Sequence, residues 1–196
     1  MDKLTVGTWI ENPLTGQRNL LVRLPSETGG WSYVIEYINQ PFTGKAGQPF
    51  HYHLTYTEKF EILSGRARYR LGNKERVAEA GSLVVLPPVI PHLHPWSDSN
   101  EDLHVRQTVE ANPPDLAGLN ACINTGITFC GLARDRRVGK NGLPGLLQLA
   151  VSARSTMPVT YSAGIPIGVQ LFLFGILATM GEWRGYRATY ARYGEV

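Results

Sequence analysis

The sequence predicts a mainly β domain, a sandwich or a small barrel, followed by a helical extension. Up to residue 111, short β-prone runs alternate with turn signals such as Gly29-Gly30 and Ser64-Gly65, a pattern typical of short strands joined by tight turns. The 21 glycines and 13 prolines also favour frequent turns. After residue 111 the apolar residues follow a helical pattern instead. We therefore expect the β domain over residues 1–111 and the helical extension over residues 112–196.

The β-prone runs of the first part define the expected strands. Gly72-Asn73 lies between two such runs and predicts a two-residue hairpin turn. Many short strands at close spacing suggest a sandwich or a small barrel. The expected strands cover residues 17–24, 31–38, 50–55, 60–63, 67–71, 83–86 and 103–109.

Three helices are expected in the extension. The segment Asn112-Pro113-Pro114-Asp115 offers a cap, a proline for the first turn and an acidic residue, so a helix should run on from about Leu116. A second helix is expected over residues 144–155, and a third within the apolar residues 165–180.

Composition and charge exclude several classes of protein. A hydrophobic fraction of 43% and a charged fraction of 18% exclude extensive disorder. The net charge of +3 is small and dispersed, which argues against a nucleic-acid partner. The N-terminus lacks the basic and apolar regions of a secretory signal, and Cys122 and Cys130 lack CxxC spacing. We therefore expect a cytoplasmic protein with both cysteines reduced.

Residues 155–181 contain no charged residue, and arginines follow at positions 184, 187 and 192. Hydropathy alone would admit a membrane helix, because a span needs about 20 apolar residues. The densest run is shorter, and polar or helix-disfavouring residues interrupt it at Pro166, Gly168, Gln170 and Gly175. We prefer a helix that packs on the protein surface or on a second copy of the chain. Membrane contact through residues 155–183 stays open.

A group of histidines with one glutamate indicates the chemistry. His51 and His53 are two residues apart, so on a strand both project from one face. Glu58 lies at an odd offset, so a turn within residues 54–57 must intervene if its carboxylate is to join them. His92 follows a proline-rich turn further along the chain. A barrel that joins these segments gathers three imidazoles and one carboxylate, which suits a divalent first-row metal with open positions.

These residues resemble the two motifs of the cupin superfamily. The matching residues are Gly47, His51, His53, Glu58 and Gly65 for the first motif, and Gly81, Pro87 and His92 for the second. The chain departs from the pattern at Gly47, which stands too close to His51, and at Val89 and Trp96, which replace a glycine and an asparagine. The resemblance covers roughly residues 30–110. It implies a small cupin jelly-roll barrel whose metal is held by His51, His53, Glu58 and His92.

Further side chains are candidates for a substrate pocket: Tyr52, Phe60, Tyr69, His94, Trp96 and His104. The aromatic ones either pack in the core or line an apolar pocket. His94 shares a strand face with His92, and we expect it to line the pocket or support a ligand rather than bind the metal. His104 is expected at an edge strand or the pocket rim, and Glu61 fits the ligand spacing less well than Glu58.

The resemblance leaves the reaction open, because cupins include dioxygenases, isomerases, lyases, decarboxylases and binding proteins. We expect a metal-dependent enzyme that holds Fe, Mn, Ni or Zn and acts on a small hydrophobic or aromatic molecule. A redox metal favours a dioxygenase-like oxidoreductase in which Glu58 also shuttles a proton, whereas zinc or manganese favours lyase or isomerase chemistry. The alternatives are a non-catalytic binding protein with a structural metal and a membrane-associated cupin. We also expect a homodimer with the apolar helices at its interface.

Overall fold

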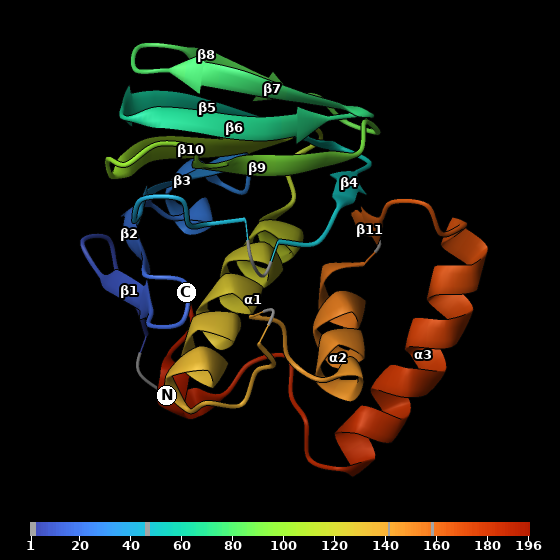
Figure 1. Ribbon diagram of the computed structural model, residues 1–196. Helices are drawn as coiled ribbons and strands as arrows, with labels where there is room; N and C mark the ends of the chain where they lie inside the picture. The colour runs from blue at the N-terminus through green and yellow to red at the C-terminus, as the bar shows by residue number, and fades with distance from the viewer. Residues whose placement is uncertain (1–2, 46–47, 141, 158) are drawn as a thin grey trace.

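The computed structural model describes residues 3–45, 48–140, 142–157 and 159–196. Gly47, the first glycine of the motif, lies outside these described residues. Within them, the chain forms two antiparallel sheets and a group of helices that covers one end of the sheets (Figure 1).

The larger sheet has six strands, in the order β1-β2-β3-β10-β5-β8. Its strands are β1 Trp9–Asn12, β2 Gln17–Arg23, β3 Ser32–Asn39, β10 Leu103–Ala111, β5 Tyr56–Ser64 and β8 Leu83–Leu86. The smaller sheet has five strands, in the order β11-β4-β9-β6-β7. Its strands are β11 Thr160–Ser162, β4 His51–His53, β9 His92–Ser97, β6 Arg66–Leu71 and β7 Lys74–Glu79.

The two sheets face each other across a shared core. β10 and the first part of β5 bury every second residue, because alternate side chains of a strand point to opposite faces. The buried cluster between the sheets combines residues of both, including Phe60 and Val105 from the larger sheet and Ala67 from the smaller one. One inward position of β10 carries the polar Gln107 instead of an apolar residue.

The helical part follows β10, which ends at Ala111. Its helices are α1 Leu116–Arg134, α2 Leu146–Thr156 and α3 Ile167–Trp183, with short 3-10 turns at Pro25–Thr28 and Ala191–Tyr193 elsewhere in the chain. Asp115 caps α1, because its carboxylate accepts from the Gly118 amide at 2.8 Å and from the Tyr56 hydroxyl at 2.7 Å. Leu119, Ile123 and Ile127 then bury one side of α1 in the core that it shares with the barrel.

All the expected strands and helices have counterparts in the structure, and β6 and β7 meet at the predicted Gly72-Asn73 turn. β1, β9 and β11 were not expected. β9 contains Pro95, which argues against a strand in a sequence pattern, and β11 has three residues. β11 pairs with β4, so the helical extension contributes a strand to the barrel (Figure 1).

Among the described helices, α1 alone has the length and apolarity to cross a membrane, and 44% of its most apolar window is buried inside the protein. α3 is apolar but has 17 residues. In Figure 1, α3 lies at the outer edge of the molecule, next to α2 and away from α1.

Candidate metal centre

Five side chains meet at the end of the barrel that faces the helices. His51 and His53 come from β4, Glu58 comes from β5, and His92 and His94 come from β9. His51 and His92 are paired across the two neighbouring strands, which brings their rings to 4.6 Å between centroids. A bend at residues 54 and 55 separates β4 from β5, so the odd offset of Glu58 is absorbed there, as the sequence analysis required.

Three of the imidazoles are oriented by hydrogen bonds at Nδ1. His51 Nδ1 lies 2.9 Å from the Pro49 carbonyl oxygen, and His92 Nδ1 lies 2.8 Å from the Ile90 carbonyl oxygen. A carbonyl only accepts, so in the neutral form of both rings Nδ1 carries the proton and Nε2 keeps a lone pair. His53 Nδ1 lies 2.9 Å from the Thr160 hydroxyl. This is the arrangement that fixes a histidine for metal binding through Nε2.

The carboxylate of Glu58 is the centre of the cluster. Its Oε2 lies 3.0 Å from Nε2 of His92, 3.0 Å from Nε2 of His94 and 3.7 Å from Nε2 of His53. Its Oε1 accepts a 2.8 Å hydrogen bond from the side-chain amide of Gln107. Burial opposes ionisation, but the neighbouring imidazoles of His94, His53 and His92 hold the pKa of Glu58 well below its ordinary value.

The residues present fit a divalent metal ion. Nε2 of His53 and Nε2 of His92 are buried and have no hydrogen-bond partner among the described residues. A buried nitrogen without a partner is costly, and a metal ion would use both lone pairs. Burial and the neighbouring His94, His53 and His92 hold the pKa of His51 well below its ordinary value, so this ring is neutral, as a ligand must be.

The tightest donor group differs from the predicted set in one residue. The donor atoms of His51, Glu58, His92 and His94 all lie within 4.8 Å of one another. The predicted set has His53 in place of His94. His53 is nevertheless part of the same cluster, with its Nε2 directed at Glu58. The structure therefore offers five donors, and His94 is closer to them than the sequence analysis expected, because β9 continues straight through His92 and His94 as a strand.

Val89 replaces a glycine of the second motif, yet the turn keeps its backbone conformation. The motif has a glycine at this position, and the chain keeps the left-handed backbone that a glycine would allow, with φ of 60° at Val89. The Val89 amide donates a 2.7 Å hydrogen bond to the carbonyl oxygen of His53. The turn before His92 is thus tied to the strand that carries the other histidines, at the cost of an unfavourable conformation for a β-branched residue.

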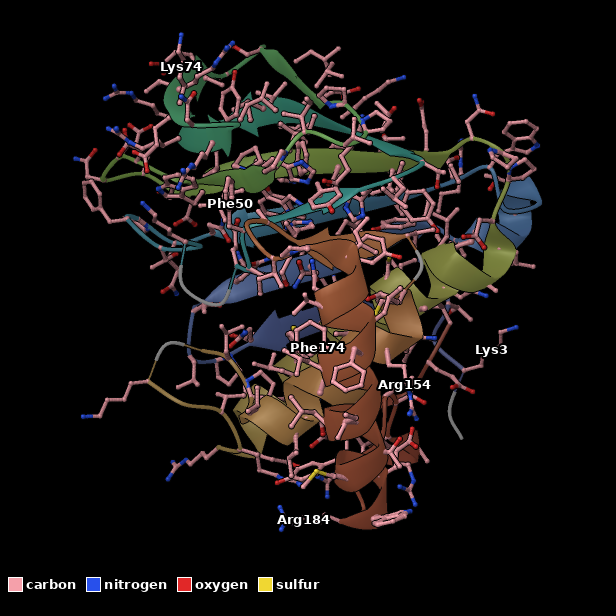
Figure 2. The ribbon with its side chains drawn as sticks, turned by 90° about the vertical axis from the view of Figure 1, so that its right-hand side faces the viewer. Lys3, Phe50, Lys74, Arg154, Phe174 and Arg184 are labelled. Atoms are coloured by element: carbon pink, nitrogen blue, oxygen red, sulfur yellow. The ribbon has the colours of Figure 1, made fainter. Side chains whose placement is uncertain are left out.

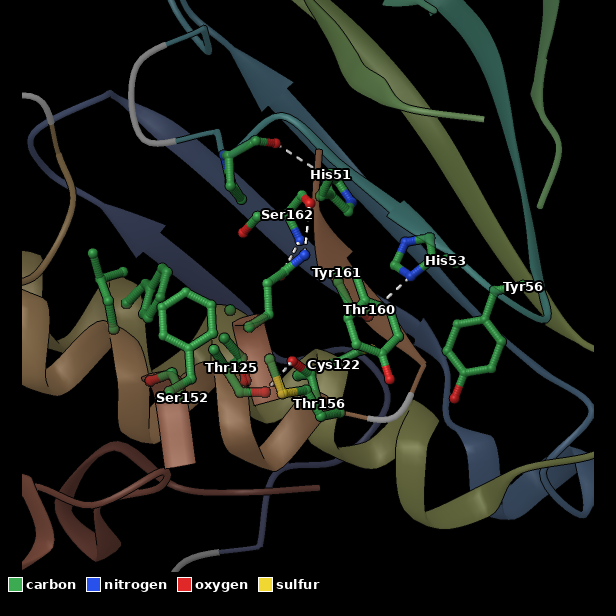
Figure 3. Close-up of a pocket in the computed structure, with 18 of the residues that line it drawn as sticks. His51, His53, Tyr56, Cys122, Thr125, Ser152, Thr156, Thr160, Tyr161 and Ser162 are labelled. Carbon is green, nitrogen blue, oxygen red and sulfur yellow. Dashed lines mark hydrogen bonds between the residues drawn. The ribbon is translucent and has the colours of Figure 1, made fainter. Parts of the chain in front are cut away.

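A cavity of about 440 Å³ extends from the cluster into the helical part. His51, His53, Glu58 and His94 line its inner end, whereas α1, α2 and α3 supply residues such as Phe129, Leu149 and Phe174. Figure 3 shows the β4 histidines across the cavity from Cys122 of α1 and Thr156 of α2. No described lining residue is a lysine, an arginine or an aspartate. The metal cluster is therefore the charged end of an otherwise largely apolar cavity.

Cys122 lines this cavity but is not a thiolate. Burial, together with the charge of Glu58, raises the pKa of its thiol to about 12. A thiol that stays protonated at neutral pH is neither a good metal ligand nor a nucleophile. The candidate metal ligands are therefore the histidines and Glu58, without Cys122.

The residues predicted for the substrate pocket are dispersed over the barrel. Only His94 among them lies on the cavity wall. Phe60 is fully buried in the core between the sheets, with its ring 5.1 Å from the ring of His94. Tyr69 packs against the same core. Phe60 therefore packs against His94 from the core, whereas Tyr69 is partly buried beside that core.

Of the other three candidates, Tyr52 and His104 are partly exposed, whereas Trp96 is buried. The Tyr52 ring is 5.9 Å from that of Tyr161, which itself lines the cavity. Trp96 is covered by the Lys45 ammonium at 4.6 Å from its ring centre. His104 Nε2 lies 3.0 Å from the carboxylate of Glu36 on the outside of β3.

Two residues of the centre were missed. Gln107 holds Glu58 in place, and the sequence does carry a signal for it, namely a polar residue within the inward row of β10. Thr160 contacts His53 from the helical extension. Nothing in the sequence points to Thr160, because the three-residue β11 that carries it has no strand pattern.

The architecture can now be assigned. Two facing antiparallel sheets carry the two motif segments, and the segments meet at one cluster of histidines around Glu58. The barrel has the cupin fold. No protein-family model matches the chain, and no curated protein matches it.

Similar solved structures align with the cupin barrel. One is a predicted oxalate decarboxylase from Thermotoga maritima, with 15% identity and a TM-score of 0.45 over 57% of this chain and 99% of that one. Another is a sugar phosphate isomerase from a cupin superfamily, from Silicibacter pomeroyi, with 17% identity and a TM-score of 0.41 over 51% of this chain and 62% of that one. A third is Streptomyces Pac13 with uridine, with 15% identity and a TM-score of 0.42 over 57% of this chain and 82% of that one. At these values the similarities carry no argument about the reaction.

Proposed function

We propose that this cupin is a metal-dependent enzyme that acts on a small, uncharged and largely apolar organic molecule. The observation that carries the proposal is the convergence of the imidazole Nε2 atoms on Glu58 in the wall of a largely apolar cavity. A metal held there would face a space large enough for a small molecule, since ligand pockets span about 300–1,000 Å³.

The residues of the cluster have two roles, metal binding and proton transfer. His51, His53, Glu58 and His92 would hold the ion, and the two unpartnered Nε2 atoms of His53 and His92 favour this set. When bound, a first-row ion supplies Lewis-acid activation of a substrate oxygen or, if it is redox-active, access to dioxygen. Glu58 is a carboxylate at neutral pH and lines the cavity, so its oxygens can take up and return a substrate proton.

The side chains of the cavity wall favour an uncharged substrate. A phosphate or a second carboxylate on the substrate would need a cation or a set of free amide donors, and the described wall contains neither a lysine nor an arginine. Its rings and aliphatic side chains instead suit an aromatic or aliphatic body. A single polar group of the substrate would point toward Glu58 and the histidines. This matches the hydrophobic or aromatic substrate class that the sequence analysis expected.

Elemental analysis of the purified protein tests the metal. We expect close to one equivalent of a first-row metal in the wild type and a large loss in His51→Ala. The matched control is His104→Ala, because His104 pairs with Glu36 outside the cluster, and it should keep its metal. Equal metal contents in the wild type and His51→Ala would contradict the proposal.

Activity is tested with the metal that is found. For iron or nickel, oxygen consumption with phenolic and diketone compounds is the first measurement. For zinc or manganese, chromatographic detection of cleaved or isomerised product replaces it. A protein that binds its metal and such compounds without turnover would be the non-catalytic binding protein. The homodimer and the cytoplasmic location stay predictions.

A further inference from the structure

The outward face of α3 is apolar and has no partner among the described residues. The exposed side chains on or next to this helix are Ile165, Val169, Leu171, Phe172, Leu173, Ile176, Met180 and Trp183. Phe172 is 67% exposed and Trp183 is 85% exposed. A surface with this many contiguous large apolar residues on one helix marks a binding site.

The opposite face of α3 is fixed to the protein, so the apolar face stays outward. The amide of Gln170 is buried, and it donates to the Ser162 carbonyl and accepts from the Ser162 amide, each at 2.9 Å. Near the other end, Glu182 forms an ion pair with Arg154 of α2. A Cβ at Gly181 would meet Val151 at 2.8 Å, which shows how closely α3 lies on α2. Figure 2 shows α3 as the element nearest the viewer, with Phe174 on it.

Charge favours a lipid surface as the occupant. Arg184 and Arg187 follow α3 and are exposed, whereas Glu182, the one acidic residue of the helix, is paired with Arg154. Trp183 and Arg184, both exposed, end α3 side by side. Tryptophan and arginine are the residues that settle at the headgroup level of a bilayer, and basic residues there attract anionic lipids.

The polarity of the face argues against a second copy of the chain. The one hydroxyl on the exposed side of α3 belongs to Thr179, and it already donates to the Gly175 carbonyl at 2.9 Å. Interfaces between proteins usually contain about one hydrogen bond per 100–200 Å². This face has almost nothing with which to form one. Hydrocarbon needs no such partner.

We propose that the outward face of α3 docks on an anionic lipid bilayer, with the helix lying in the plane of the membrane surface. The same helix contributes Phe174 to the wall of the apolar cavity, and Leu146, which is 61% exposed at the start of α2, also lines it. The docked face and the cavity thus lie on two sides of one helix. Resting on the proposed function, we infer that the substrate is a lipophilic molecule taken from the bilayer.

Flotation with vesicles tests the docking. The probes are vesicles of phosphatidylcholine alone and of phosphatidylcholine with phosphatidylglycerol. We expect the wild type to float with the anionic vesicles and Phe172→Glu to bind at least tenfold less. The matched control is Phe42→Glu, because Phe42 is 69% exposed but lies in the loop after β3, and it should bind like the wild type. Arg184→Gln should weaken binding to anionic vesicles roughly fivefold.

The test is independent of the metal. Docking should be equal in the wild type and in His51→Ala, so a failure of metal binding leaves it intact. The proposal would be overturned if the wild type bound neither type of vesicle. It would also be overturned if light scattering without lipid showed a dimer that Phe172→Glu, but not Phe42→Glu, converts to a monomer, because a second copy would then cover the face.

Discussion

The side-chain hydroxyl of Thr160, on β11, lies 2.9 Å from Nδ1 of His53, on β4. The two residues are 107 positions apart in the chain, and the contact joins the helical extension to the metal centre. β11 pairs with β4 through Thr160, Tyr161 and Ser162. The extension therefore helps to orient a donor of the site that it also covers.

Replacing Thr160 tests this connection. Thr160→Val keeps the shape of the side chain but removes the hydroxyl, so His53 loses the contact that orients its ring. We expect metal affinity to fall about 10–100-fold, the usual cost of losing such an outer hydrogen bond. Titration with a chromophoric chelator measures it. Thr160→Ser keeps the hydroxyl and should restore most of the affinity, whereas equal affinities for Val and Ser would refute a role for the hydroxyl.

The fifth donor is tested by comparing His53→Ala with His94→Ala. Nε2 of His53 is buried and unpartnered, whereas Nε2 of His94 is paired with Glu58 and its side chain is 27% exposed. We expect His53→Ala to lower metal affinity by more than about 100-fold, beyond the loss of an outer hydrogen bond, and His94→Ala to lower it less. Cobalt substitution and its visible spectrum report the ligand set. The reverse order would assign His94 to the metal and His53 to its surroundings.

Gly126 allows the cavity to be filled without disturbing the fold. It lies within α1 on the cavity wall, and a Cβ there would meet no atom of the described residues outside its own helix within 4 Å. Gly126→Leu should raise the free energy of unfolding by about 0.5–1 kcal/mol, since glycine is unfavourable inside a helix. It should also weaken binding of an apolar dye such as Nile red more than tenfold, and leave the metal content unchanged. Gly126→Ala should show the stabilisation with little loss of dye binding.

The left-handed backbone at Val89 predicts a stabilising substitution. A non-glycine residue in this conformation costs about 1–2 kcal/mol, and the added freedom of glycine in the unfolded chain offsets part of the gain. Val89→Gly should therefore raise the free energy of unfolding by about 1 kcal/mol, which corresponds to a rise in Tm of about 2–4 °C. Val85→Gly, within β8, should lower it instead. A lower Tm for Val89→Gly would contradict the reading of this turn.

The outer ion pair of Glu36 gives a pH-dependent stability. Burial alone would raise its pKa, but hydrogen bonds and charge from Arg106 and His104 outweigh this and hold the pKa of Glu36 below its ordinary value. A carboxylate with a lowered pKa stabilises the fold above its unfolded pKa, and this contribution is lost as the pH falls through the folded pKa. Glu36→Gln should lower stability by about 1 kcal/mol at pH 7. Urea unfolding should show this difference shrinking below about pH 4.

The sequence predicted the barrel, the order of its elements apart from β1, β9 and β11, and four of the five residues that form the cluster. Both the alternation along the strands and the spacing of His51 and His53 follow from the geometry of a single strand. Residues close together in the sequence are therefore enough to predict them. The bend that brings Glu58 to them was also required by its odd offset.

Only the tertiary structure decided what surrounds the cluster. His94 joins it because β9 pairs with β4, and Gln107 and Thr160 reach it from strands far away in the chain. The cavity exists because α1, α2 and α3 pack over the barrel end, and the outward face of α3 is apolar because its few polar contacts are turned inward. Such relationships depend on which segments meet across long loops, and no local spacing records that.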